Sequence, residues 1–138
     1  MQRVMRLSSE GLSCSQILMT MALEDRGCSS PELIQAMDGL AMGCGMGQAS
    51  CGVLTGAACV LGLYAGADGP NRGPSPDLKP MLAQLHQWFV VAAEMPRGEL
   101  SCQAVMGTEP SPMSMYKCAE LVAKAYVKTT ELLAAYGL

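Results

Sequence analysis

Residues 39–67, GLAMGCGMGQASCGVLTGAACVLGLYAGA, carry no charged side chain and decide the fold more than any other stretch of the chain. The segment opens with closely spaced glycines and becomes an apolar helical pattern after Ser50-Cys51. A glycine-rich bend that ends in a cysteine puts the thiol at the start of a helix, where unpaired backbone N–H groups and the helix dipole favour a thiolate. We therefore expect cysteine chemistry centred on Cys51.

The composition predicts one compact helical domain over residues 1–138. A chain of this length can bury a real core without structural staples. Half of the residues are hydrophobic but only 4% are aromatic, so the core must be built from Leu, Val, Ala and Met in closely packed helices. A net charge of −3 with only nine Lys and Arg residues argues against a nucleic-acid partner, because phosphate binding needs cationic side chains.

Two apolar stretches bear on the cellular location. Residues 1–7 lack the continuous apolar core of a secretory signal. Residues 49–67 approach the length of a membrane span, but Ser50, Thr55 and several glycines interrupt them, and flanking aromatic belts and basic anchors are missing. We expect a buried helix there and no membrane insertion. Seven cysteines, an odd number, predict free thiols in a reducing compartment, the cytoplasm.

The rest of the sequence predicts an all-α fold of five or six helices, because apolar residues recur at helical spacing and rarely alternate at the strand period. Ser8 or Ser9 caps an expected first helix that runs to about Arg26, where Gly27 ends it. Gly52 and Gly56 share one face of a later helix and allow another backbone to approach closely. The further helices are expected at residues 31–42, 50–66, 77 to just before Pro96, 102–106 and 111–136.

Three cysteines follow a serine at or near an expected helix start, and a fourth comes early in the last helix. Serine is a favoured N-cap, so each thiol lies near free N–H donors. If these helix starts converge, the thiols share one pocket, suited either to a dithiol that exchanges disulfides or to a four-thiolate ligand set for an iron–sulfur cluster or zinc. The four are Cys14, Cys51, Cys102 and Cys118.

Five local motifs surround these cysteines. They are Cys14-Ser15-Gln16-Ile17-Leu18, the glycine bend at residues 43–47, Cys51-Gly52-Val53-Leu54-Thr55-Gly56-Ala57, Cys102 followed by Met106-Gly107, and Cys118 ahead of Leu121-Val122. Together they resemble the redox-active proteins named for the cysteine pattern C_GCAxxG_C_C, over about residues 7–133. The resemblance implies a redox role for the four cysteines and a functional link to a transporter, because many members are encoded near transporter genes. It implies no particular substrate.

The chain departs from the family pattern in two ways. Val53 stands where the family usually has alanine, and three cysteines are additional: Cys28, Cys44 within the glycine bend, and Cys59. Cys59 comes eight residues after Cys51 and so lies on roughly the same helix face. Each extra cysteine is either a resolving thiol or a small buried hydrophobic residue.

The sequence leaves three functions open. In the leading hypothesis, Cys51 is the nucleophilic thiolate, a second cysteine closes the disulfide, and an unidentified redox partner is oxidised or reduced. In the second, the four cysteines bind an iron–sulfur cluster in an electron carrier or sensor without substrate turnover. In the third, the chain is a structural module that forms a homodimer through its Gly52–Gly56 face.

Methionine and histidine add minor alternatives. Met42, Cys44 and Met46 form a run of soft ligands that would select Cu(I), although methionine also fills gaps between helices when aromatic residues are scarce. His86 is the only histidine and has no catalytic motif around it, so we expect a surface or packing role.

Overall fold

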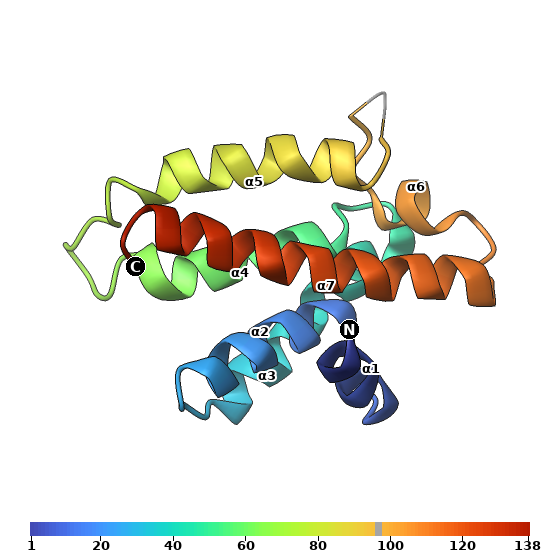
Figure 1. Cartoon of the computed structure of the whole chain (residues 1–138), viewed down its shortest axis with the longest axis horizontal. Helices are drawn as coiled ribbons and strands as arrows, with labels where there is room; N and C mark the ends of the chain where they lie inside the picture. Colours follow the sequence, from blue (N-terminus) through green and yellow to red (C-terminus); the bar gives the residue numbers. More distant parts are fainter. Residues whose placement is uncertain (96–97) are drawn as a thin grey trace.

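The structure is a computed structural model that describes residues 1–95 and 98–138, and in these residues it is all-α, as the sequence predicts (Figure 1). The described residues form seven α-helices, one more than the expected upper limit of six. They are α1 (Gln2–Ser9), α2 (Cys14–Asp25), α3 (Pro31–Met37), α4 (Gly52–Ala65), α5 (Leu78–Ala92), α6 (Cys102–Met106) and α7 (Pro112–Ala135).

Helix α4 forms the centre of the molecule and packs against α2, α5 and α7. Figure 1 shows α5 and α7 running along α4, with α1, α2 and α3 gathered on one side. The side chains of Val53, Ala57 and Leu61 on α4 are fully buried, because the apolar pattern covers the whole circumference of this helix. No helix in residues 1–95 or 98–138 combines the length and the apolar character that crossing a bilayer requires.

The close backbone approach predicted at Gly56 is confirmed. A Cβ atom added there would lie 3.0 Å from the Ser15 Cα atom, so only glycine lets α2 cross α4 at this distance. Gly52 is buried in the same way, against Leu40. The Gly52–Gly56 face is therefore occupied within the chain, and homodimer formation stays a prediction.

The expected first helix begins later than predicted, at Cys14, and a separate helix that was not predicted, α1, precedes it. Gly11 adopts a φ of 91°, which turns the chain between α1 and α2. Helix α2 then begins behind Ser13, whose backbone N–H donates to Gln16 Oε1 at 3.1 Å. The short apolar spacing of Val4 and Leu7, both 1% exposed, is the signal that identifies α1 as a separate element.

The second expected helix is shorter than predicted, and the later boundaries agree closely. Helix α3 ends at Met37 and a 3-10 turn covers Asp38–Leu40, after which Met42 takes a left-handed φ of 55° that no helix can continue. Helices α4, α6 and α7 begin and end within about two residues of the predicted positions. Helix α5 ends at Ala92, and the stop signal predicted for it at Pro96 lies outside the described residues.

Candidate thiol site

The four cysteines predicted to act together line a single cavity of about 570 Å³, called the thiol cavity below. Each comes from a different element: Cys14 begins α2, Cys51 precedes α4, Cys102 begins α6 and Cys118 lies in the second turn of α7. The fold thus brings helix starts that are far apart in sequence to one place. What the thiols do there stays a prediction.

A short antiparallel bridge between Ser50 and Ser101 holds two of these cysteines side by side. The Cys51 backbone N–H donates to the Leu100 carbonyl at 2.6 Å, and the Cys102 N–H donates to the Ala49 carbonyl at 3.2 Å. The Ser101 hydroxyl also accepts the Ala104 N–H at 3.1 Å and so caps α6. Two of the three Ser-Cys pairs, Ser50-Cys51 and Ser101-Cys102, are therefore joined by backbone hydrogen bonds.

Two glycines make room for the sulfur atoms. A Cβ added at Gly52 would lie 2.8 Å from the Cys14 Sγ atom, and one added at Gly43 would lie 3.2 Å from the Cys102 Cβ atom. Contacts this short force the neighbour to move. The glycine at each position allows a thiol to pack directly against the backbone of another element.

The glycine bend (Gly43–Gly47) has an unusual left-handed backbone. Gly43, Gly45 and Gly47 have φ values of 59°, 84° and 77°, which glycine adopts freely. Met42 and Cys44 share this region with φ values of 55° and 57°, at a cost of about 1 kcal/mol or more each for a residue with a Cβ atom. Strain of this kind concentrates at functional sites, and here it borders the thiol cavity.

The thiols in the cavity are harder to ionise than the sequence predicts. Burial raises the pKa of Cys51 to about 11 and that of Cys118 to about 12, and burial also raises the pKa of Cys14. At Cys51 the backbone N–H groups of Val53 and Leu54 favour the thiolate, as expected at a helix start, but desolvation outweighs them. The prediction that Cys51 is a stabilised thiolate is wrong.

Cys102 differs from Cys51 in its access to solvent. Burial raises its pKa as well, yet the side chain is only half-buried, whereas Cys51 is 2% exposed. A half-buried thiol can meet a partner molecule, and a fully buried thiol cannot do so without movement of the fold.

The cavity wall is uncharged: none of the described residues that line it is an acid, a base or a histidine. Three methionines contribute to it, Met42, Met46 and Met106. Met106 belongs to a motif that the sequence shows around Cys102, but its place in the cavity wall was not predicted, although its position four residues after Cys102 puts both side chains on one face of α6. This i, i+4 spacing is the signal that could have identified it.

The remaining candidates lie elsewhere. Cys28 and Cys44 are exposed and Cys59 is half-buried on α4, and none of them lines the thiol cavity. Eight helical residues separate Cys59 from Cys51, which is about 12 Å along the axis. His86 is an exposed residue of α5, as expected for a surface role.

The iron–sulfur and zinc alternatives require several ligands around one metal. In residues 1–95 and 98–138, no three Cys, His, Asp or Glu side chains are arranged to hold a single metal ion. All seven cysteines are present as free thiols.

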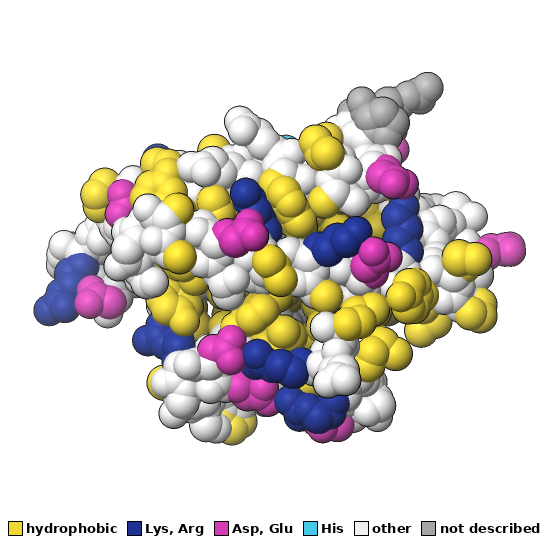
Figure 2. Space-filling model, in the orientation of Figure 1, with side chains coloured by type: hydrophobic (Ala, Val, Ile, Leu, Met, Phe, Trp, Pro, Cys, Tyr) yellow, Lys and Arg dark blue, Asp and Glu magenta, His cyan; other side chains and the backbone are white. Residues whose placement is uncertain are grey.

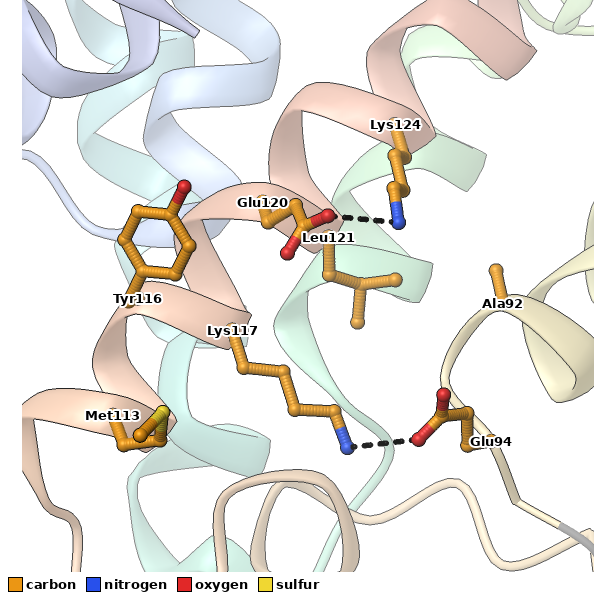
Figure 3. A pocket seen from close by; sticks show the side chains of 8 residues that line it. All are labelled: Ala92, Glu94, Met113, Tyr116, Lys117, Glu120, Leu121 and Lys124. Atoms are coloured by element: carbon orange, nitrogen blue, oxygen red, sulfur yellow. Dashed lines mark ion pairs between the residues drawn. The ribbon is translucent and has the colours of Figure 1, made fainter.

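A second hollow, the charged hollow, lies between the end of α5 and the first half of α7 and has a volume of about 440 Å³ (Figure 3). Its amines and carboxylates pair with each other: Lys124 contacts Glu120 at 3.0 Å, and Lys117 contacts Glu94 at 4.0 Å. No cysteine is among its described lining residues. Its chemistry is therefore that of solvated ion pairs.

The fold and the thiol cavity define a small all-α protein with clustered free thiols. The family model described as putative redox-active protein (C_GCAxxG_C_C) matches residues 12–132, and the chain belongs to this family. Comparisons with curated proteins and with solved structures give no match. A redox-active role, stated at this level, accords with the family description and with the sulfur-lined cavity.

Proposed function

We propose that the protein carries out thiol–disulfide exchange in the thiol cavity, with Cys102 as the attacking thiol and Cys14 as the resolving thiol. The observation that carries this proposal is the lining of one uncharged cavity by four free thiols from four elements. Exchange needs two such thiols within reach of one another and one of them within reach of a partner. It does not need a bound cofactor.

Exposure and pKa favour Cys102 over Cys51 as the attacking group. With a pKa of about 11, roughly one in 10⁴ Cys51 side chains is a thiolate at neutral pH, and the side chain is 2% exposed. Cys102 is half-buried and lies in the wall of the cavity. Cys14 is the better resolving thiol because it, too, is only half-buried and lies close enough to Cys102 for the charges of the two thiolates to interact.

The exchange balances as follows. The Cys102 thiol loses its proton to solvent, and its sulfur attacks one sulfur of a disulfide on the redox partner. The partner's other sulfur leaves as a thiolate and takes up a proton. Cys14 then loses its proton, attacks the Cys102 sulfur and releases the first partner sulfur, which is protonated in turn. The protein's two thiols become one disulfide, and the partner's disulfide becomes two thiols.

Raised thiol pKa values also predict the direction of the exchange. A fold that disfavours thiolates stabilises its reduced dithiol less than a fold that favours them, so its disulfide is harder to reduce. We expect a midpoint potential at or below about −270 mV, the thioredoxin range, in contrast to strongly oxidising proteins near −120 mV.

Equilibration with dithiothreitol buffers, followed by counting of free thiols by mass spectrometry, tests the proposal. The wild-type protein should lose two thiols per chain in one step, and peptide mapping should place the disulfide between Cys14 and Cys102. Cys14→Ser and Cys102→Ser should each abolish the step. Cys28→Ser is the matched control, since Cys28 is exposed outside the cavity, and it should titrate like the wild type.

Two results would overturn the proposal. One is a step that persists unchanged in both Cys14→Ser and Cys102→Ser. The other is visible sulfur-to-iron absorption in anaerobically purified protein that disappears in these variants, which would establish the iron–sulfur alternative.

A further inference from the structure

The glycine bend and α6 bring thioether sulfur atoms to the mouth of the thiol cavity. Met42 immediately precedes the bend, Met46 lies within it, and Met106 ends α6; all three line the cavity. The two elements are in direct contact, because a Cβ at Gly43 would touch the Cys102 side chain and one at Gly47 would lie 3.8 Å from the Gln103 Cβ atom. The methionines of the bend and the cysteine of α6 therefore line one cavity across two elements in contact.

Packing does not explain the methionines of the bend. Methionines that fill the core are buried, as Met19 and Met81 are at 1% and 0% exposure. Met42 and Met46 are 61% and 78% exposed. Moreover, Met42 has a left-handed φ of 55°, which is unfavourable for a residue with a Cβ atom. Two thioethers are thus presented to solvent beside a thiol, in a strained backbone.

The strongest metal donors of this corner are soft sulfur atoms, and its oxygen donors are the neutral side chains of Ser13, Gln48, Gln103 and Thr108. Thioether and thiolate sulfur select Cu(I) over hard cations, and the described lining residues provide neither carboxylate nor imidazole for such cations. Cu(I) accepts two to four sulfur ligands, thioethers among them, so it does not need the group of three Cys, His or carboxylate side chains that the described residues lack.

The absence of charge from the described cavity wall favours one thiolate over two. Two thiolates on Cu(I) would leave a net negative charge in a partly desolvated site, with no cation in the described wall to balance it. One thiolate with neutral thioethers gives a neutral complex. Cys102 is the half-buried thiol closest in sequence to Met106, and both lie on one face of α6.

We propose that Cys102, Met106 and the bend methionines Met42 and Met46 form a binding site for Cu(I). In the binding step Cu(I) replaces the proton of the Cys102 thiol, which passes to solvent, and the thioethers complete the coordination without a change in charge. The oxidation state of copper does not change. The site is independent of the proposed exchange reaction except that both use Cys102.

Anaerobic titration of the reduced full-length protein with Cu(I), in competition with the chromogenic chelator bicinchoninate, tests the site. The wild-type protein should bind one Cu(I) per chain with sulfur-only coordination in X-ray absorption. Met42→Leu/Met46→Leu conserves side-chain volume at exposed positions and should raise the Kd at least about tenfold. Met5→Leu/Met113→Leu is the matched control, since these side chains are 51% and 80% exposed outside the thiol cavity, and should leave the Kd unchanged.

The outcomes separate this site from the exchange reaction. The Met42→Leu/Met46→Leu variant should keep the full thiol–disulfide titration, because it retains every cysteine. Cys102→Ser should lose both Cu(I) binding and the titration. Absence of Cu(I) binding by the wild-type protein, or wild-type affinity in Met42→Leu/Met46→Leu, would overturn the proposal whatever the result of the thiol titration.

Discussion

Helix α7 lies between two hollows, and two consecutive residues of the helix line one hollow each. Lys117 lines the charged hollow against α5, whereas Cys118 lines the thiol cavity. In the first, amines and carboxylates form ion pairs that remain open to solvent. In the second, four thiols lie among uncharged described residues. One helix thus separates hard, solvated ionic groups from soft, partly desolvated sulfur.

The comparison shows what controls thiol ionisation in this protein. A nearby cation or a helix N-terminus lowers a thiol pKa, and burial raises it. Lys117 and Lys124 of α7 line the charged hollow, so Cys51 in the thiol cavity has only backbone N–H groups to oppose desolvation. Desolvation prevails, and the thiols stay protonated at neutral pH.

The largest expected effect is a loss of stability at alkaline pH; Cys118 contributes to it, and so does Cys51. The pKa of Cys51 rises from 9.0 in the unfolded chain to about 11 in the folded protein. Below about pH 9 both states hold the proton; between about pH 9 and about pH 11 only the folded state does, so the free energy of unfolding falls as pH rises. The shift corresponds to about 3 kcal/mol.

Urea unfolding of reduced protein across this pH range measures the effect. Cys51→Ala should flatten the alkaline decline relative to the wild type, and Cys28→Ala, at an exposed thiol, should not change it. An identical alkaline decline in wild type and Cys51→Ala would show that the thiol cavity is more solvated than its burial implies, which breaks the contrast with the charged hollow.

The next effect concerns the packing that keeps the thiol cavity closed. In Gly52→Ala the new Cβ would lie 2.8 Å from Cys14 Sγ and 2.9 Å from the Leu40 carbonyl oxygen, so the backbone must shift. We expect a loss of about 2 kcal/mol in the free energy of unfolding, measured by urea denaturation, together with faster alkylation of Cys14.

Gly62→Ala provides a control on the same helix. Nothing lies within 4 Å of a Cβ at this position, and alanine is the better helix former, so stability should increase by about 0.5–1 kcal/mol. If Gly52→Ala lowers the free energy of unfolding and Gly62→Ala raises it, the loss at Gly52 comes from packing at the thiol cavity and not from helix propensity, which sharpens the comparison. Equal signs would contradict it.

The sequence predicts the thiol cavity better than the chemistry of its members. Spacing of serine, cysteine and apolar residues is a local property, and it located Cys14, Cys51 and Cys102 at or next to helix starts. Ionisation depends on how deeply each thiol is buried, which follows from the packing of α2, α4, α6 and α7 together. Local reasoning therefore identified the N–H donors at Cys51 but could not weigh them against desolvation.

The same limit explains the errors in the fold. The helix predicted from Ser8 or Ser9 to Arg26 runs through Gly11, where the chain in fact turns. A single glycine inside a helical pattern is compatible with either a continuous helix or a turn. Gly52 and Gly56 were rightly identified as sites of close approach. Whether the approaching backbone belongs to the same chain or to a second copy depends on long-range topology, which residue spacing does not encode.

A smaller effect is expected where α1 joins α2 through surface ion pairs. Glu24 contacts Arg6 at 3.0 Å and Arg3 at 2.9 Å, and the hydrogen bond from Arg6 is the main cause that lowers the Glu24 pKa from 4.5. Figure 2 shows acidic and basic side chains interspersed on this face. The stabilisation is therefore complete above about pH 4.5 and is lost as pH falls through the lowered pKa.

Glu24→Gln should remove this acid-sensitive contribution, which is less than about 1 kcal/mol for such exposed groups. Thermal unfolding at about pH 6 and about pH 3.5, with Glu32→Gln as an exposed control, measures it. A loss above about 2 kcal/mol in Glu24→Gln would mean that these surface charges support the core, and the contrast between ionic surface and apolar interior would need revision.

The smallest expected effect concerns Lys117, the residue of α7 that lines the charged hollow directly before Cys118 in the thiol cavity. Lys117 contacts Glu94 at 4.0 Å, with side chains 41% and 81% exposed, and a pair of this kind contributes little because solvent screens both charges. Lys117→Gln should change the free energy of unfolding by less than about 0.5 kcal/mol and should leave the thiol–disulfide titration unchanged. A third measurement is the pH dependence of the alkylation of the cavity thiols by iodoacetamide, which should also stay unchanged. Suppose that Lys117→Gln raises the pKa that the pH dependence of alkylation gives for the cavity thiols. The charge of Lys117 would then act across α7, and desolvation alone would not set the pKa of the neighbouring Cys118.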